Sequence, residues 1–152
     1  MSHDQAEAIT PESLTATGWK QHTLQGHMGQ MGPLWSQPLE TGGWRYGMCM
    51  EDRHLNPAGM VHGGVLLTLA DHAMSAVAWQ HSQRQPCVTV QLDSQFLAPA
   101  RAGDWVQARV DITHSSRSMV FASAQLWVGS QQVLQAQGIL KVLAAPTAAS
   151  PS

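Results

Sequence analysis

The sequence predicts an α+β fold in which one long helix packs against a single antiparallel sheet. One almost continuously apolar segment, residues 63–80, has the length and composition of a buried helix. Four later segments alternate between apolar and polar residues, which is the two-residue period of half-buried strands. The connections between them are too short for the crossover helices that a parallel sheet requires. At 152 residues, the chain has the length of one domain.

The first 24 residues are predicted to form an N-terminal segment with one short helix. Thr10 followed by Pro11 and Glu12 is typical of a helix start, with Pro at the first helical position. We expect this helix to end near Gly18. Residues 1–9 and the tail 144–152 hold too little apolar surface to offset the entropy of ordering, so the first are expected to be loose and the tail disordered.

The folded domain is expected to span residues 25–143 and to begin with a loop and a hairpin. Residues 25–33 contain four Gly or Pro and are predicted to be a loop. Residues 35–40 and 44–50 flank Thr41-Gly42-Gly43, a typical hairpin connection. Pro38 cannot donate a ladder hydrogen bond, so the first run is expected to be an edge strand.

The strands after the helix are predicted at residues 88–96, 104–113, 119–128 and 133–142. In the first, the residues alternate as Val88, Val90 and Leu92 against Thr89, Gln91 and Asp93. We expect the four strands to pair as an antiparallel meander. One long central helix wrapped by an antiparallel sheet of about five to six strands is the architecture of the hotdog fold.

Two features of the helix region indicate a functional site. The helix is apolar except for a stripe at spacings of three and four residues, made by Thr68, Asp71, His72 and Ser75. This stripe is either the solvent side of the helix or the lining of a polar cavity or interface in which Asp71 acts. The helix begins with Gly63 and Gly64, which allow close approach to free backbone amides, although tight packing would also favour glycine.

Composition and charge exclude several classes of function. Eight Lys or Arg against ten Asp or Glu give a net charge of −2, which provides no basic face for nucleic acid. Cys49 and Cys87 are far from any CxxC spacing, so we expect free thiols in a reducing, cytoplasmic compartment. The N-terminus lacks a signal-peptide pattern and no apolar run could span a membrane. His62 and His72 lack a second ligand at three- or four-residue spacing, so no metal is expected.

One longer pattern carries a family resemblance. It consists of Asn56-x-x-Gly59-x-Val61-His62-Gly63-Gly64, then Asp71, then Val88-Thr89-Val90, then Phe96-Leu97-x-Pro99-Ala100-x-x-Gly103-Asp104. Over roughly residues 35–142 the chain resembles the hotdog acyl-CoA thioesterases of the phenylacetic-acid-degradation type. The resemblance implies hydrolysis of an acyl-CoA to a free acid and CoA, with no cofactor and no metal.

The resemblance also implies roles for the matching residues. Asp71 is expected to be the nucleophile or the general base, and the Gly63 amide the oxyanion donor beside Gly64, which contacts substrate. Asn56 corresponds to the residue that orients water or the acyl carbonyl. His62 corresponds to the residue that shapes the start of the helix.

Two hydroxyls and one arginine complete the expected site. Thr89 matches a hydroxyl that lies near the carboxylate in some members of the family. Ser75, one turn beyond Asp71, matches a hydroxyl that serves in relatives whose carboxylate is Glu. Arg117 stands where many relatives have Gly-Arg in a hairpin turn, and is expected to contact the CoA phosphates, although the turn here reads Ser115-Ser116-Arg117.

The spacing of Gly63 and Asp71 predicts a homodimer, or a dimer of dimers. Eight residues of helix separate them by about 12 Å, whereas a reacting carbonyl must lie roughly 3 Å from both the oxyanion donor and the carboxylate. The two residues therefore cannot serve one site within one chain. Each site must combine Gly63 of one subunit with Asp71 of another, and two-fold symmetry then gives two sites.

Two other functions stay open at this point. A β-hydroxyacyl thioester dehydratase of the same fold would use His54 or His62 together with an acidic residue on the helix. A non-catalytic acyl-CoA-binding module would keep Gly63 and Gly64 but would not need a carboxylate in the polar stripe.

Overall fold

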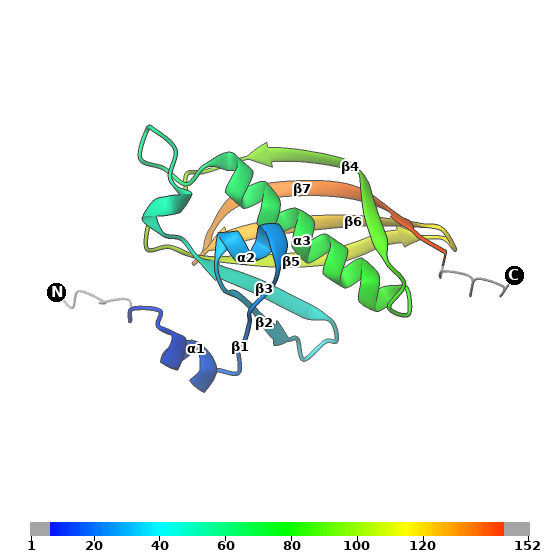
Figure 1. The fold of residues 1–152 in the computed structure, drawn as a ribbon, viewed down its shortest axis with the longest axis horizontal. Coiled ribbons are helices and arrows are strands. Elements are labelled where there is room, and N and C mark those ends of the chain that lie inside the picture. The colour runs from blue at the N-terminus through cyan, green and yellow to red at the C-terminus, as the bar shows by residue number, and fades with distance from the viewer. Residues whose placement is uncertain (1–6, 145–152) are drawn as a thin grey trace, which may run out of the picture.

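The computed structural model describes residues 7–144, which form a seven-stranded antiparallel sheet curved around one long helix (Figure 1). The elements in chain order are α1 (Pro11–Ala16), β1 (Lys20–His22), α2 (Gly26–Met31), β2 (Leu34–Pro38), β3 (Trp44–Cys49), the 3-10 turn η1 (Asp52–His54), α3 (Gly63–His81), β4 (Cys87–Phe96), β5 (Trp105–Ser115), β6 (Met119–Val128) and β7 (Gln131–Val142). This confirms the hotdog fold, with one strand more than expected. The predicted loose residues 1–6 and the tail from residue 145 lie outside the described residues.

Helix α1 begins as predicted and ends two residues early, at Ala16. The Thr10 hydroxyl accepts a hydrogen bond from the Ser13 amide at 3.1 Å, and the Ser13 hydroxyl accepts one from the Thr10 amide at 2.9 Å. This reciprocal cap satisfies two amides at the helix start. The helix lies on the outer face of the sheet, where a small cluster is formed by Leu14, Trp19, Trp35 and Trp105.

The prediction of a loop over residues 25–33 is wrong, because residues 26–31 form α2. Met28 is buried, and Met31, three residues later, packs against the main core. Both side chains therefore lie on one face of a short helix. Their burial outweighs the low helix propensity of Gly26 and Gly29, on which the prediction of a loop depends.

The prediction that the first hairpin strand is an edge strand is also wrong. Strand β2 pairs with β3 on one side and with the short strand β1 on the other, and β1 is the edge. Pro38 is compatible with this position because β1 covers only Leu34 to Ser36. The missing amide of Pro38 thus falls beyond the paired segment.

The strands after the helix are all antiparallel, as predicted, but they do not form a four-strand meander. Strands β5, β6 and β7 are consecutive neighbours, whereas β4 pairs with β7 at the far edge of the sheet. β5 cannot pair with β4 because β3 and β6 already occupy both of its edges. The β4–β5 connection therefore crosses the sheet, and it is held near the start of α3 by a hydrogen bond from the Val61 amide to the Ala100 carbonyl at 2.8 Å.

Helix α3 supplies the centre of the core and carries the polar stripe on its other side. Its sheet-facing residues are almost fully buried: Leu66, Leu69, Ala70, Ala73, Met74 and Ala78. The stripe residues are only half-buried. Both ends of the helix agree with the predicted span to within one residue. Among the described residues, no helix is long and apolar enough to cross a membrane.

Candidate active site

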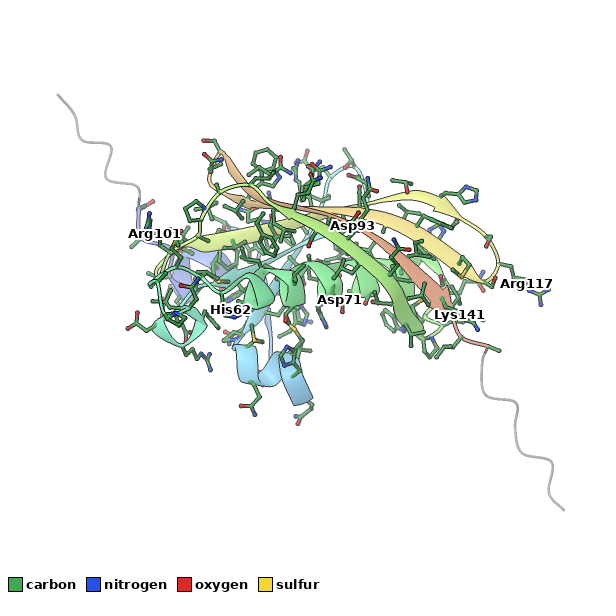
Figure 2. The ribbon with its side chains drawn as sticks, turned by 90° about the horizontal axis from the view of Figure 1, so that it is seen from above. His62, Asp71, Asp93, Arg101, Arg117 and Lys141 are labelled. Atoms are coloured by element: carbon green, nitrogen blue, oxygen red, sulfur yellow. The ribbon has the colours of Figure 1, made fainter. Side chains whose placement is uncertain are left out.

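The carboxylate of Asp71 lies against strand β4. Thr89 on β4 donates a hydrogen bond from its hydroxyl to Asp71 Oδ1 at 2.6 Å. Asp71 is half-buried and Thr89 is exposed, so the pair opens to solvent along the edge of the sheet. Figure 2 shows Asp71 projecting from the middle of α3 on the side of β4. The contact fixes one oxygen of the carboxylate and leaves the second free to react.

A β-bulge brings Thr89 to Asp71. The register of β4 on β7 shifts between Thr89 and Gln91, so Val90 is an extra residue. Without it, Thr89 would share a face with Gln91, as the predicted alternation had it. With it, Thr89 and Leu92 both face α3, and Val88 and Val90 are 43% and 52% exposed rather than buried. The predicted alternation is therefore wrong at this point of β4.

The loop before α3 is folded around the side chain of Asn56. Asn56 Oδ1 accepts hydrogen bonds from the amides of Ala58 at 3.0 Å and Met60 at 3.1 Å. The Asn56 amide donates to the Met60 carbonyl at 2.7 Å, which closes the loop. The carbonyl oxygen of this side chain therefore has a structural role. Its NH₂ group forms no hydrogen bond to the part of the chain that the structure describes, and is the atom that remains for substrate or water.

His62 caps α3 and leaves Gly63 as the available backbone donor. His62 Nδ1 accepts a hydrogen bond from the Gly64 amide at 2.8 Å, which requires the neutral ring to carry its proton on Nε2. The Val65 amide donates to the His62 carbonyl at 2.9 Å. Within residues 7–144 the Gly63 amide has no hydrogen-bond acceptor. At the positive end of the helix dipole it can stabilise a developing oxyanion.

A pocket of about 420 Å³ opens beside Gly63. Its lining includes Asn56 and Met60 from the loop, and Phe96, Leu97 and Pro99 after β4. A Cβ atom at position 63 would lie 2.9 Å from the Phe96 ring, so any other residue would have to displace this exposed side chain. Phe96 and Leu97 belong to the motif that carries the family resemblance, but the sequence alone assigns them no role. Two large apolar residues just before a proline were the signal available.

The structure separates the predicted site residues into two groups along α3. Ser75 is half-buried one turn beyond Asp71 and forms no hydrogen bond among the described residues. Gly63 and Asp71 both lie on α3, so eight residues of helix separate them by about 12 Å along its axis. Within one chain, the structure joins Asp71 with Thr89, and it joins Gly63 with Asn56 and His62. It does not join the two groups to each other.

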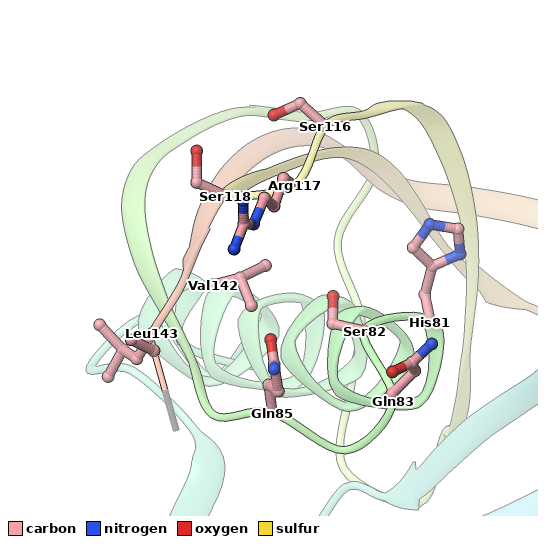
Figure 3. Close-up of a pocket in the computed structure, with 10 residues that line it drawn as sticks. His81, Ser82, Gln83, Gln85, Ser116, Arg117, Ser118, Val142 and Leu143 are labelled. Carbon is pink, nitrogen blue, oxygen red and sulfur yellow. The ribbon is translucent and has the colours of Figure 1, made fainter. Parts of the chain in front are cut away.

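Arg117 belongs to a third location, at the far end of α3. Figure 3 shows a pocket between the end of the helix, the β5–β6 turn and the end of β7. It has a volume of about 590 Å³ and its polar lining includes His81, Ser82, Ser116, Arg117 and Ser118. His81 also hydrogen-bonds Ser115 at 3.0 Å. This pocket begins about 15 Å along the helix axis from Asp71.

Both ring nitrogens of His54 have structural partners. His54 is buried, with Nδ1 accepting from the Glu51 amide at 2.9 Å and Nε2 donating to the Met31 carbonyl at 2.7 Å. Both ring nitrogens are therefore occupied, which argues against His54 as the base of a dehydratase. No group of three or more metal-ligating side chains is found between residues 7 and 144. Cys49 and Cys87 are both free thiols.

His72 follows Asp71 in sequence but faces the other edge of the sheet. Burial lowers the pKa of His72, the negative charge of Asp71 raises it, and the nearby His22 lowers it. Burial and then the charge of Lys20 lower the pKa of His22. His22 Nε2 and the Ser36 hydroxyl are hydrogen-bonded at 2.6 Å. The lowered pKa of each residue favours its neutral imidazole form.

Comparison with known proteins identifies the family. The model of the thioesterase superfamily matches residues 58–135, a little over half of the chain. This segment begins in the loop before α3 and runs through β4, β5 and β6 into β7. The chain belongs to the thioesterase superfamily, and its class of activity is thioester hydrolysis.

Two relatives support the assignment over the same region. The Pseudomonas aeruginosa protein named "Putative esterase PA0474" is 38% identical over 91 residues, which are 59% of this chain and 68% of that protein. Acyl-coenzyme A thioesterase 13 of Mus musculus is 32% identical over 92 residues, 60% of this chain and 65% of the mouse protein. The matched segment thus spans about two thirds of each relative.

Solved structures share the fold. The BH2602 protein from Bacillus halodurans, crystallised with CoA, superposes with a TM-score of 0.67 at 25% identity, covering 73% of this chain and 74% of that one. The E. coli PaaI protein from the phenylacetic acid degradation operon gives a TM-score of 0.63 at 18% identity, with 88% and 85% coverage. These comparisons confirm the predicted resemblance to the hotdog thioesterases.

Proposed function

We propose that the protein is an acyl-CoA thioesterase that hydrolyses its substrate to a free acid and CoA. The observation that carries the proposal is the fixed Asp71–Thr89 pair on one part of α3 together with the unbonded Gly63 amide at its start. A carboxylate and an oxyanion donor are the two groups that thioester hydrolysis needs. The acyl-CoA assignment is supported by the mouse relative, an acyl-coenzyme A thioesterase, and by the CoA-bound Bacillus structure.

In the proposed reaction, each group of the chain has one task. The Gly63 amide donates a hydrogen bond to the carbonyl oxygen of the thioester as negative charge develops on that oxygen. Asp71 either attacks the carbonyl carbon directly or removes a proton from an attacking water. Thr89 holds Asp71 Oδ1, so the second oxygen faces the substrate. Breakage of the carbon–sulfur bond releases CoA as a thiolate, which takes up a proton. Direct attack leaves the acyl group on Asp71 as a mixed anhydride, which a water molecule then hydrolyses. In both routes the acid leaves as a carboxylate.

The proposed site is shared between two subunits. Gly63 and Asp71 are too far apart for one substrate carbonyl, and β4 is an edge strand with exposed Val88, Val90 and Phe96. An exposed apolar edge strand is a surface that pairing with a second copy covers. We propose that two β4 strands pair around a two-fold axis, which places Gly63 of one subunit against Asp71 of the other.

We further propose that the Arg117 pocket receives the phosphates of CoA. Arg117, Ser116 and Ser118 provide a permanent positive charge and two hydroxyl donors on one turn. The pocket lies at the carboxyl end of α3, where the helix dipole disfavours an anion, so the arginine is the essential element. Replacing Arg117 with Gln should raise KM for acyl-CoA and leave it unchanged for an acyl thioester that lacks the nucleotide.

Mixed subunits test the shared site most directly. Purified protein is assayed for thiol release from aryl- and fatty-acyl-CoAs, and then Asp71→Ala and Gly63→Val subunits are unfolded and refolded together. Each variant alone should be inactive. A random equal mixture should recover about a quarter of the wild-type sites, because half of the dimers are mixed and each mixed dimer has one site with both intact groups.

The same assay separates the other candidate activities. Release of an enoyl thioester in place of free thiol would assign the chain to the dehydratases. Tight binding of acyl-CoA without turnover would assign it to the non-catalytic binding modules. Thiol release by both variants, or no recovery in the mixture despite normal dimers, would refute the shared site.

A further inference from the structure

The outer face of the sheet, opposite α3, carries a pocket of its own. Tyr46 and Ala108 belong to the core between the sheet and α3, so their neighbours Arg45 and Arg109 point to the outer face. The pocket has a volume of about 460 Å³, within the range of small-molecule sites. We call it the outer groove, and it is lined by Arg45, Gln107, Arg109, Trp127, Gly129 and Ser130.

Two arginines lie directly opposite each other in this groove. Arg45 on β3 and Arg109 on β5 are register partners, so their Cβ atoms are about 5 Å apart and like charges at this spacing repel. The single ion pair found between residues 7 and 144 joins Arg53 and Glu51, elsewhere on the surface. Neither guanidinium in the groove is therefore neutralised by a carboxylate of the described chain, including Asp111 on the same face of β5.

The two guanidiniums differ in how they are held. Arg45 Nε donates to Gln37 Oε1 at 2.7 Å, and its guanidinium lies 5.0 Å from the centre of the Trp19 ring. Burial and then the positive charge of Arg109 lower the pKa of Arg45. Arg109 is exposed, and its side chain forms no hydrogen bond within the described chain. One fixed and one free guanidinium can close on a dianion from two sides.

We propose that the outer groove binds a mononucleotide, with its phosphate between Arg45 and Arg109 and its base on the ring of Trp127. The two negative charges of the phosphate would neutralise the two opposed arginines, which have no carboxylate partner in the described chain. Trp127 is the cross-strand partner of Gln107 and offers a flat aromatic surface on which a base can stack. The Ser130 hydroxyl adds a donor at the rim. The groove lies on the face of the sheet opposite Asp71, so this proposal does not depend on the proposed reaction.

Calorimetric titration of the full chain with AMP, inorganic phosphate and adenosine tests the proposal. AMP should bind more tightly than phosphate, and adenosine should not bind measurably. Arg109→Gln should weaken AMP binding by about tenfold or more, since a charge-assisted contact is lost. In the absence of AMP, the Arg109→Gln variant should unfold at the same urea concentration as wild type or at a higher one, because a repulsive contact is removed. That result would separate loss of the site from loss of the fold.

One matched control locates the binding. Arg101→Gln removes one exposed arginine outside the groove and should leave AMP affinity unchanged. AMP can also bind in the pocket proposed for the CoA phosphates, so the titrations are repeated in the Arg117→Gln background, where binding to the outer groove should persist. Trp127→Leu should reduce AMP affinity to that of phosphate. The proposal is overturned if AMP does not bind, if Arg109→Gln binds it as wild type does, or if Arg117→Gln abolishes it. It is equally overturned if phosphate binds as tightly as AMP, or if Arg109→Gln changes only the assembly state.

Discussion

Asp71 and His72 are neighbours in the sequence but face opposite edges of the sheet, and the chain treats these two sides of α3 differently. On the side of His72, β1 and α2 cover the helix. His72 lies beside His22, His22 is bonded to Ser36, and His27 on α2 is bonded to Thr68 on the helix at 3.1 Å. Two of the three imidazoles on this covered side, those of His22 and His27, are hydrogen-bonded within one chain.

The side of Asp71 is open. Strand β4, which lies on this side, has one neighbour in the sheet. The side chains on and just after β4 include the exposed Val90, Phe96 and Leu97. Thr89 holds one oxygen of Asp71, and nothing else in the described chain is bonded to that carboxylate. An exposed apolar strand beside a half-buried carboxylate is a surface that a substrate or a second copy can cover.

The contrast shows how one helix can serve two purposes. Burial of one side by an N-terminal segment stabilises the subunit, whereas the other side keeps a reactive group and an apolar surface available. Substitutions on the open side should therefore change the rate with little effect on folding. Substitutions on the covered side should change stability with little effect on the rate.

The largest effect is expected for Asp71→Asn. The amide has the same shape and keeps the stripe polar, but it can neither attack the thioester nor accept a proton from water. Turnover should fall by at least about a hundredfold, while the free energy of unfolding changes by less than about 0.5 kcal/mol. The measurements are kcat from thiol release and a urea denaturation curve.

Ser75→Ala is the matched control for this change, since Ser75 lies one turn away on the same stripe. If both variants lose turnover equally, the stripe as a whole and not the carboxylate is required. A rate within threefold of wild type for Asp71→Asn would remove Asp71 from the mechanism and favour a binding module.

The next effect concerns the positioning of the carboxylate by Thr89. Thr89→Val removes the hydroxyl that donates to Asp71 Oδ1 and keeps the branched shape that suits a strand. We expect kcat to fall about tenfold with little change in KM, because the lost bond orients the reacting group and does not touch the acyl chain. Thr89→Ser should restore most of the rate. Thr113→Val, on the exposed part of β5, is the control and should behave as wild type.

A smaller effect is expected from the covered side as the pH falls. The pKa of both His22 and His72 is lowered from 6.5 in the folded chain, so the unfolded chain binds more protons in acid. Stability should therefore be constant above about pH 7.5 and decrease as the pH falls below about 6.5. The urea midpoint should show this slope in wild type, a shallower one in His72→Gln, and the wild-type slope in His114→Gln. An equal slope in all three would contradict the assignment.

The comparison of the two sides also explains which parts of the fold could be predicted. The apolar run of α3 and the alternation in β5, β6 and β7 depend on local patterns, so their predicted positions agree closely with the structure. Helix α2 depends on the burial of Met28 against the core, and its glycines give no local signal of a helix. β1 has only three residues and exists because β2 offers an edge.

For the candidate site, the sequence could identify residues but not their contacts. The family resemblance identified Asp71, Gly63 and Thr89 as candidate site residues. The alternation of apolar and polar residues predicted the wrong face of β4 for Thr89, because one extra residue, Val90, shifts the register. The cap that His62 forms on the Gly64 amide and the commitment of Asn56 Oδ1 to its own loop follow only from the folded chain. Phe96 meets Gly63 across more than 30 residues of sequence, a distance over which periodicity carries no information.

The smallest effect is expected for His27→Gln, at the boundary between the two sides. The Thr68 hydroxyl already donates its one proton to the Gly64 carbonyl at 2.9 Å, so His27 must donate to the Thr68 oxygen. Both residues of this bond are accessible to water, and glutamine can also donate, so stability should change by less than about 0.5 kcal/mol and turnover by less than about threefold. Urea denaturation and the thiol assay measure the two values. A larger rise in KM for long acyl chains than for short ones would instead make α2 a wall of the acyl pocket, and the covered side would then belong to the site.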